Sequence, residues 1–215
     1  MTSSTSTALP TSDLATYLRE STAAAHKDAE SRPLNRALAR GTIPREAWIA
    51  NLEQLFLLHR ALDARVARSL GRHPEWQAIA DRARVADLEA DLAAFGSTGA
   101  PTPVAAIASG VAEIEAASDD EIAGMLYVTE GSTNGGRFLV KSLTRALGAN
   151  GATPTRALDP YGDQQPARWA QFKAVLAALP FDPVRFDLVR RGADRMFAMI
   201  GEIAEQVWSR AQPAA

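Results

Sequence analysis

Apolar residues recur at helical spacing almost throughout this chain, and this periodicity constrains its fold more than any other feature. Alanine, leucine, arginine and glutamate dominate, and no segment shows the strict alternation of a half-buried strand. At 215 residues the chain is long enough for one well-buried domain. The sequence therefore predicts an all-α, single-domain, multihelical fold of about seven or eight helices.

Prolines, glycines and capping residues place the ends of the expected helices. A Ser/Thr-rich leader over 1–12 is expected to be disordered, and the helical domain to cover 13–210. The expected helices cover 14–29, 44–70, 76–95, 103–117, the segment from a cap at Ser118 to a connector that begins at Gly148, 166–179 and 183–210.

Composition excludes several classes of protein. The 23 basic residues nearly balance the 25 acidic ones, so we expect no nucleic-acid partner. The absence of cysteine excludes disulfides, iron–sulfur clusters and thiol nucleophiles. No apolar run reaches the length of a membrane span, and the first residues lack the charged and apolar regions of a signal peptide. We therefore expect a cytoplasmic protein with no membrane partner.

One expected helix carries three glycines within six residues: Gly131, Gly135 and Gly136. Each glycine in a helix interior costs roughly 1 kcal/mol relative to alanine, so the three together cost about 3 kcal/mol. Such a sequence needs either a kink or a backbone free of side chains. The small-x-x-x-small spacing fits close helix packing and a cofactor surface equally well.

A histidine in the first helix is the second unusual feature. Helical spacing puts Arg19, Thr22, His26 and Glu30 near one face, and three alanines directly precede the histidine. A flat group can thus approach His26 closely, and Glu30 can orient its ring as a ligand. The alternative is a histidine packed at the edge of the core with Glu30 solvated. His73, in a helix-ending turn, is expected to be a solvated surface residue.

Taken together, these two helices resemble the biliverdin-producing haem oxygenases, especially the bacterial members associated with phytochromes. The first helix of that family has the pattern Leu-(Arg/Lys)-Glu-x-Thr-x-x-x-His-x-x-x-Glu, which Leu18 to Glu30 match. Its distal helix is kinked over haem at a Gly-x-x-x-Gly-Gly run, which Gly131, Gly135 and Gly136 match. The resemblance extends from about Asp13 to Val207.

The resemblance implies haem sandwiched between the first helix and the kinked distal helix. His26 would be the axial ligand of the haem iron, and Glu30 would accept its other ring N–H. The glycines Gly131, Gly135 and Gly136 would let the distal backbone lie close to the porphyrin. Haem b would be both substrate and cofactor. With O2 and external electrons it would be cleaved at a meso carbon to biliverdin, CO and Fe2+.

Further residues match family positions around the haem. Arg19 matches a basic position near a propionate, and Phe197 matches an aromatic position that lines the pocket, although an ordinary core role suits it nearly as well. The basic residues that hold propionates on the penultimate helix are replaced by Ala170 and Ala174. The in-plane orientation of haem is therefore open.

The distal proton supply also departs from the family. Animal members carry an aspartate directly after the first distal glycine, where this chain has Ser132. A tyrosine that supports the distal water corresponds to His59. We hypothesise that His59 and Ser132 together order that water; the alternative is that His59 faces the core.

Implied partners are an electron donor, either a ferredoxin or a reductase, and a bacteriophytochrome as biliverdin acceptor. A haem-binding or transport protein without efficient turnover is the alternative function. A thiaminase-like hydrolase would need a cysteine, and a helical di-iron protein would need Glu-x-x-His pairs. The chain has neither.

Overall fold

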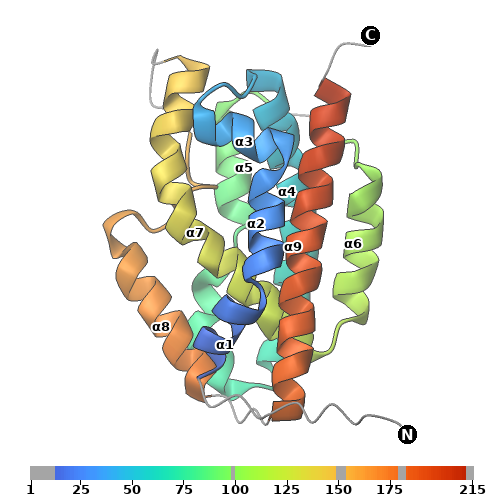
Figure 1. Cartoon of the computed structure of the whole chain (residues 1–215), viewed down its shortest axis with the longest axis vertical. Coiled ribbons are helices and arrows are strands. Elements are labelled where there is room, and N and C mark those ends of the chain that lie inside the picture. Colours follow the sequence, from blue (N-terminus) through green and yellow to red (C-terminus); the bar gives the residue numbers. More distant parts are fainter. Residues whose placement is uncertain (1–12, 98–99, 149–153, 179–182, 212–215) are drawn as a thin grey trace, which may run out of the picture.

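The computed structural model describes residues 13–97, 100–148, 154–178 and 183–211, and the predicted leader over 1–12 lies outside them. The described part is all-α, as the sequence predicts (Figure 1). Its elements are α1 (Leu14–Ser21), α2 (Ala23–Ser31), α3 (Pro33–Arg40), α4 (Arg45–Leu70), the 3-10 segment η1 (Pro74–Arg82), α5 (Val85–Ala94), α6 (Ala105–Ala116), α7 (Asp119–Leu147), the 3-10 turn η2 (Gly162–Gln164), α8 (Gln165–Ala178) and α9 (Pro183–Ala211).

The two longest helices, α7 and α9, form the centre of the bundle and pack against each other. Their backbones touch where they cross. A Cβ on Gly124 would overlap the backbone of Val189, and one on Gly192 would overlap the backbone of Glu121. Glycine at these two positions therefore allows a closer approach than any side chain permits.

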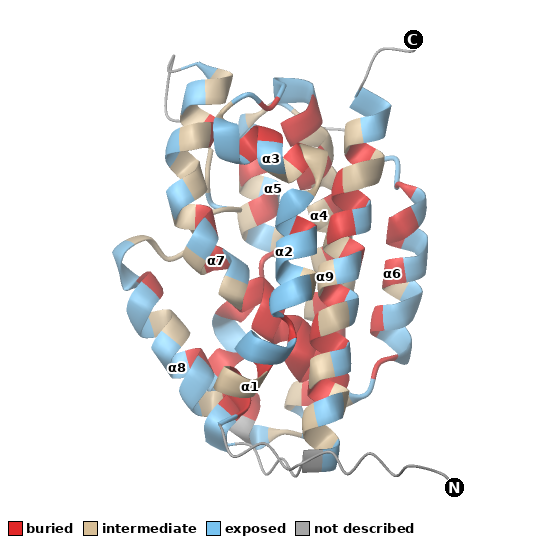
Figure 2. Cartoon of the chain, in the orientation of Figure 1, coloured by how far each residue is buried: buried red, intermediate tan, exposed pale blue. Residues whose placement is uncertain are grey.

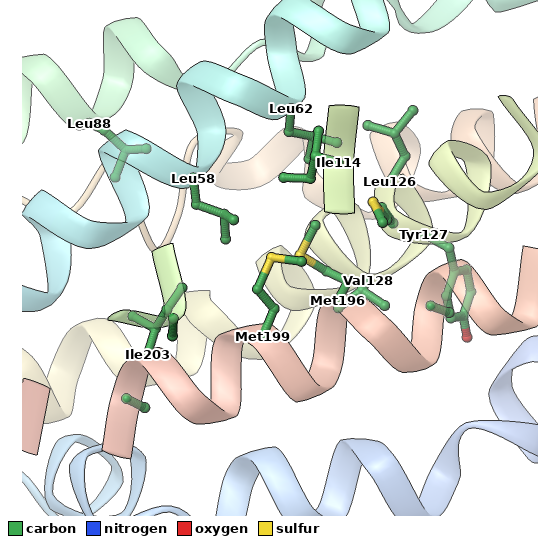
Figure 3. Close-up of a cluster of buried hydrophobic side chains, with 14 of the residues drawn as sticks. Leu58, Leu62, Leu88, Ile114, Leu126, Tyr127, Val128, Met196, Met199 and Ile203 are labelled. Atoms are coloured by element: carbon green, nitrogen blue, oxygen red, sulfur yellow. The ribbon is translucent and has the colours of Figure 1, made fainter. Parts of the chain in front are cut away.

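Apolar side chains from several helices fill the core around this crossing (Figure 3). The burial pattern follows the amphipathic periodicity, because α6 and α9 turn exposed residues outward and buried ones toward the bundle (Figure 2). No helix of the described residues is both long and apolar enough to cross a membrane. The labelled core residues are Leu58 and Leu62 of α4, Leu88 of α5, Ile114 of α6, Leu126, Tyr127 and Val128 of α7, and Met196, Met199 and Ile203 of α9.

The single first helix expected over 14–29 is wrong in one detail, because the structure divides it at Thr22 into α1 and α2. The hydroxyl of Thr22 is buried and donates to the carbonyl of Leu18 at 2.7 Å, which distorts the backbone locally. Helix α3 was also missing from the helices expected from the sequence. Extended backbone at Arg32, as expected before a proline, ends α2, and Pro33 begins α3.

The single helix expected over 76–95 is also wrong, since η1 and α5 replace it. The chain breaks at Ala83, whose ψ is 135°, so that Arg82 and Arg84 can both turn inward. The carboxylate of Asp63 then accepts hydrogen bonds from the first backbone N–H groups of α5. Side-chain pairing thus overrides helical periodicity here.

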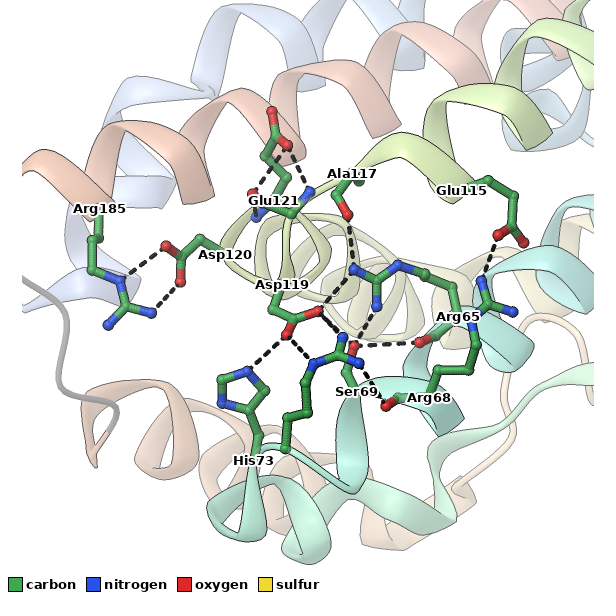
Figure 4. A network of polar contacts seen from close by, with 12 residues as sticks. Arg65, Arg68, Ser69, His73, Glu115, Ala117, Asp119, Asp120, Glu121 and Arg185 are labelled. Atoms are coloured by element: carbon green, nitrogen blue, oxygen red, sulfur yellow. Dashed lines mark hydrogen bonds and ion pairs between the residues drawn. The ribbon is translucent and has the colours of Figure 1, made fainter.

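A dense polar network fixes the start of α7 (Figure 4). Ser118 and Glu121 form a capping box there. The carboxylate of Asp119 accepts hydrogen bonds from Arg65 at 2.8 Å, Ser69 at 2.8 Å and Arg72 at 2.8 and 3.1 Å.

His73 belongs to the same network and is not the solvated surface residue that its turn suggests. Its Nε2 lies 2.9 Å from Asp119 Oδ2, and its ring stacks on Trp76 at 4.9 Å. This pairing anchors the turn before η1 to the first residue of α7.

Candidate functional site

The predicted ligand His26 lies on α2 with 57% of its side chain exposed. Its Nε2 is 3.4 Å from Glu30 Oε1, one helical turn further on. Its ring meets Phe197 of α9, with centroids 5.3 Å apart and an interplanar angle of 52°. This exposure and the contact with Phe197 fit both a ligand and the alternative of a histidine packed at the edge of the core with Glu30 solvated, so the role of His26 stays a prediction.

The helices that pack around α2 leave one face of α2 uncovered. It packs on α9, while α1 before it packs on α8 and α3 after it packs on α7. Ala23, Ala24 and His26 remain exposed. In Figure 1, α2 overlaps part of α7 in the view, and α3, which follows α2, packs on α7.

The three glycines of α7 have different surroundings. A Cβ on Gly135 would meet no atom within 4 Å, and one on Gly131 would make only an ordinary contact with Trp169, at 3.7 Å. Gly136 is different, because a Cβ there would overlap the backbone of Leu158. Gly131 and Gly135 are one turn apart and form an open strip, whereas Gly136 admits another chain segment.

Ser132 is exposed beside this strip. Its hydroxyl donates to the carbonyl of Thr129 at 2.7 Å and so is bonded back to its own helix. The oxygen of the Ser132 hydroxyl can still accept a hydrogen bond from a further donor. The helix itself runs without interruption from Asp119 to Leu147, and its ribbon bends along its length in Figure 1.

His59 lies on α4, with 14% of its side chain exposed. Its Nδ1 is buried and makes no hydrogen bond within the described residues, since the nearest carboxylate oxygen, Asp63 Oδ1, is 3.9 Å away. None of the hydrogen bonds in the described part of the chain joins His59 to Ser132. A joint role of these two residues stays a prediction.

Arg19 is exposed on α1, where it pairs loosely with Glu20 at 3.4 Å. It is close enough to Tyr127 to influence that phenol. Burial raises the pKa of Tyr127, and the positive charge of Arg19 opposes the rise. Arg19 and α7 therefore face the same region.

An aromatic wall adjoins the glycine strip, and the sequence analysis missed it. Trp169 of α8 stacks on Phe172 at 5.7 Å and meets Tyr127 at 5.7 Å, and it is the nearest group to Gly131. The sequence could have pointed to Trp169, because it directly precedes Ala170, one of the two alanines at positions where the family resemblance implies basic residues. An indole thus stands beside the place where the family has a charge.

The predicted site residues do not line a closed cavity. A cavity of about 460 Å³ lies elsewhere, between the start of α4, residues 100–104 and the end of α9, and Glu53, Gln54 and Arg210 are among its lining residues. His26, Ser132 and Gly135 are all exposed to solvent.

Solved structures of similar fold are haem oxygenases. The enzyme from Leptospira interrogans matches with a TM-score of 0.80 and 22% identity, over 90% of this chain and 99% of that one. Haem oxygenase-1 of the cyanobacterium Synechocystis, solved in complex with haem, matches with a TM-score of 0.83 and 20% identity, over 93% and 94%. Haem oxygenase-2 of the same organism, solved with haem and NO, matches with a TM-score of 0.84 and 20% identity, over 93% and 86%.

These likenesses establish the fold, and sequence comparison extends them to the family. None of the curated proteins matches the chain significantly by sequence. The family model described as "Heme oxygenase" matches residues 12–206, which include the histidine segment, the glycine helix and the aromatic wall. The match of this family model to residues 12–206 shows that the chain belongs to the haem oxygenase family.

Proposed function

We propose that this family member cleaves haem b oxidatively at a meso carbon to biliverdin, CO and Fe2+, using O2 and external electrons. The observation that carries the proposal is the open strip of Gly131 and Gly135, in a chain whose predicted ligand His26 is also exposed. When bound, haem supplies the redox-active iron and the carbon that is oxidised.

The residues present fit such a group. An imidazole with more than half its surface exposed can act as a ligand without displacing a buried partner. The strip offers a flat backbone surface, since a side chain on Gly135 would point into empty space. Trp169 and Tyr127 add apolar surface at one end, which suits a macrocycle with aromatic faces.

Each residue then has a specific task. His26 would bind the iron through one ring nitrogen, and Glu30 would accept the N–H of the other, which would fix the tautomer and the ring plane. The contact with Phe197 restricts rotation of the imidazole. Arg19, which is exposed on α1, would pair with a propionate.

Ser132 and His59 are proposed to order the distal water that delivers protons. The Ser132 hydroxyl can accept a hydrogen bond from this water while it donates to Thr129. No carboxylate belongs to the open strip formed by Gly131, Ser132 and Gly135. This observation also favours the second candidate function, a haem-binding or transport protein without efficient turnover.

The proposed partners follow from the reaction. It consumes external electrons, so we propose a ferredoxin or a reductase as donor. The likeness of the 18–30 segment to phytochrome-associated members supports a bacteriophytochrome as the biliverdin acceptor. We propose the cytoplasm as the compartment where the three meet.

Reconstitution with haemin separates the two functions. We expect a sharp Soret band with one equivalent of haemin, and biliverdin absorbance after a reductant and oxygen are supplied. A stable Soret band without turnover would instead support the carrier. A band that survives His26→Ala unchanged would overturn the axial assignment.

A second variant tests the distal proposal. We expect His59→Phe to slow turnover and to shift the acid transition of ferric haem, because the water would lose one of its two supports. Unchanged values of both would remove His59 from the proposed machinery.

A further inference from the structure

The segment that leads into α8 runs across the buried side of the glycine helix. Residues 154–165, here named the strap, include η2, and two of the contacts of the strap with α7 lie at Gly136 and Glu130. At one contact the backbone of Leu158 fills the space beside Gly136. At the other, the hydroxyl of Tyr161 donates to Glu130 Oε1 at 2.8 Å.

Glu130 is the residue directly before the first glycine, and it is buried. Its side chain is 4% exposed and forms an ion pair with Arg82, whose side chain is 3% exposed. Arg82 also donates to the carbonyl of Arg168 and to Gln171 Oε1, each at 3.0 Å. A buried carboxylate is expensive unless it is paired and hydrogen-bonded, and here every partner comes from outside α7.

The ring of Tyr161 also has partners, because three arginine side chains lie close to it. The guanidinium groups of Arg168, Arg82 and Arg84 lie 4.9, 5.5 and 5.9 Å from its centroid. Such cation–π contacts orient the ring. The phenol therefore has one direction in which to donate, toward Glu130.

The strap itself is anchored from behind. Arg84 donates to the carbonyls of Arg156 and Ala157 at 2.9 and 3.2 Å. The carboxylate of Asp91 accepts from the backbone N–H groups of the same two residues, at 3.2 and 2.8 Å. These four bonds fix the strap to α5 and its N-terminal flank, so that it can resist a movement of α7.

A third contact completes the hold. The side chain of Gln165, at the end of the strap, donates to Asn134 Oδ1 at 3.0 Å. Helical geometry places residue 130 about 140° away from Gly135 around the axis of α7, and residues 134 and 136 about 100° away on either side of it. The strap thus contacts α7 on both sides of the segment that carries the open strip, and it does not cover Gly131 or Gly135.

We propose that the strap is the positioning element of the glycine strip, and that Glu130 and Tyr161 are positioning residues that set the place of Gly131, Ser132 and Gly135 relative to His26. A helix with glycines on one face has lost side-chain packing there and is free to bend. The strap opposes bending from the other face. This inference rests on the proposed function only for its consequence at the haem.

Hydrogen exchange of the haem-free protein tests the hold directly. We expect Glu130→Gln and Tyr161→Phe each to speed amide exchange in residues 131–136 by about tenfold or more, with a smaller change in α9. The matched control is Asp120→Asn. That carboxylate lies ten residues earlier on α7 and pairs with Arg185 at 2.6 and 2.9 Å, but its pair lies outside the strap. Tyr161→Phe keeps the ring and removes one hydroxyl, so it preserves the fold if Glu130→Gln does not.

The haem-bound protein gives the second measurement. With the strap weakened, we expect a shift in the acid transition of ferric haem and a changed ratio of biliverdin isomers, neither of which Asp120→Asn should produce. Variants that merely lower stability, with exchange patterns and spectra like those of Asp120→Asn, would overturn the positioning role. A wild-type protein that binds no haem would refute the proposed function, whereas the exchange data would still decide whether the strap holds the glycine strip.

Discussion

The carbonyl oxygen of Leu158 occupies the space that a side chain on Gly136 would need. This contact shows that the glycines of α7 do not all lack a side chain for the same reason. Gly136 is required by the fold itself, because a neighbouring backbone touches it. Gly135 faces open space and has no structural reason to lack a side chain. We therefore propose that its role lies in what the protein binds.

Alanine substitutions at these two adjacent positions should have opposite effects on stability. Gly136→Ala forces a backbone apart, and we expect the free energy of unfolding of the haem-free protein to fall by about 1–3 kcal/mol. Gly135→Ala introduces no clash and favours the helix, so we expect a gain of up to about 1 kcal/mol. Urea unfolding of the haem-free variants measures both changes.

Haemin titration of Gly135→Ala completes the comparison. We expect this more stable variant to bind haem several-fold more weakly or to cleave it more slowly, because the new methyl group stands on the open strip. Wild-type affinity and turnover in Gly135→Ala would show that the strip does not face the haem.

The crossing of α7 and α9 should be equally intolerant of side chains. Gly192→Ala places a methyl group against the backbone of Glu121, in the middle of the core, and we expect a loss of about 1–3 kcal/mol or a failure to fold. Gly71→Ala is the control, since that residue has right-handed helical angles and no atom within 4 Å of its Cβ position. Thermal unfolding should show little change in the control. Equal melting temperatures in both variants would contradict the close crossing.

The network at the start of α7 should make stability depend on acid pH. Burial alone would raise the pKa of Asp119, but hydrogen bonds from Arg72, Arg65, Ser69 and His73 outweigh it and hold this pKa well below its usual range. A lowered folded-state pKa gives stability that is complete above the unfolded-state pKa of about 4 and is lost as the pH falls from that value through the folded-state pKa.

Asp119→Asn tests this dependence. We expect the variant to be less stable by about 2 kcal/mol at neutral pH, since hydrogen bonds to charged groups are among the stronger ones. The difference from wild type should shrink as the pH falls below about 4. Urea midpoints measured across this range would contradict the assignment if the difference stayed constant.

Tyr161 should produce the opposite dependence, at alkaline pH. Burial, together with the charge of Glu130 and the hydrogen bond to it, raises the pKa of Tyr161 to about 12. The unfolded chain loses this proton near pH 10, so stability should fall as the pH rises from about 10 toward the folded-state value. Tyr161→Phe should lose part of this alkaline decline, and ultraviolet difference spectra should show one fewer late-titrating phenol than in wild type.

Helical periodicity by itself determined the all-α class and most of the long helices, because an amphipathic helix must turn its apolar stripe toward a core wherever that core lies. The same local information marked His26 and the glycine run, since a histidine that follows three alanines and a helix with three glycines depart from ordinary helix composition. It failed at 76–95, where Arg82 and Arg84 turn inward toward partners that are distant in the sequence.

Only the tertiary structure decided which glycine serves which purpose. Gly135 and Gly136 are neighbours in the chain, yet one faces solvent and the other faces Leu158, because successive residues of a helix point about 100° apart. The hold on Glu130 likewise depends on Arg82 and Tyr161, which are 48 and 31 residues away. Periodicity predicts on which face of its own helix a residue lies. Which other segment packs against that face is decided only when the whole chain folds.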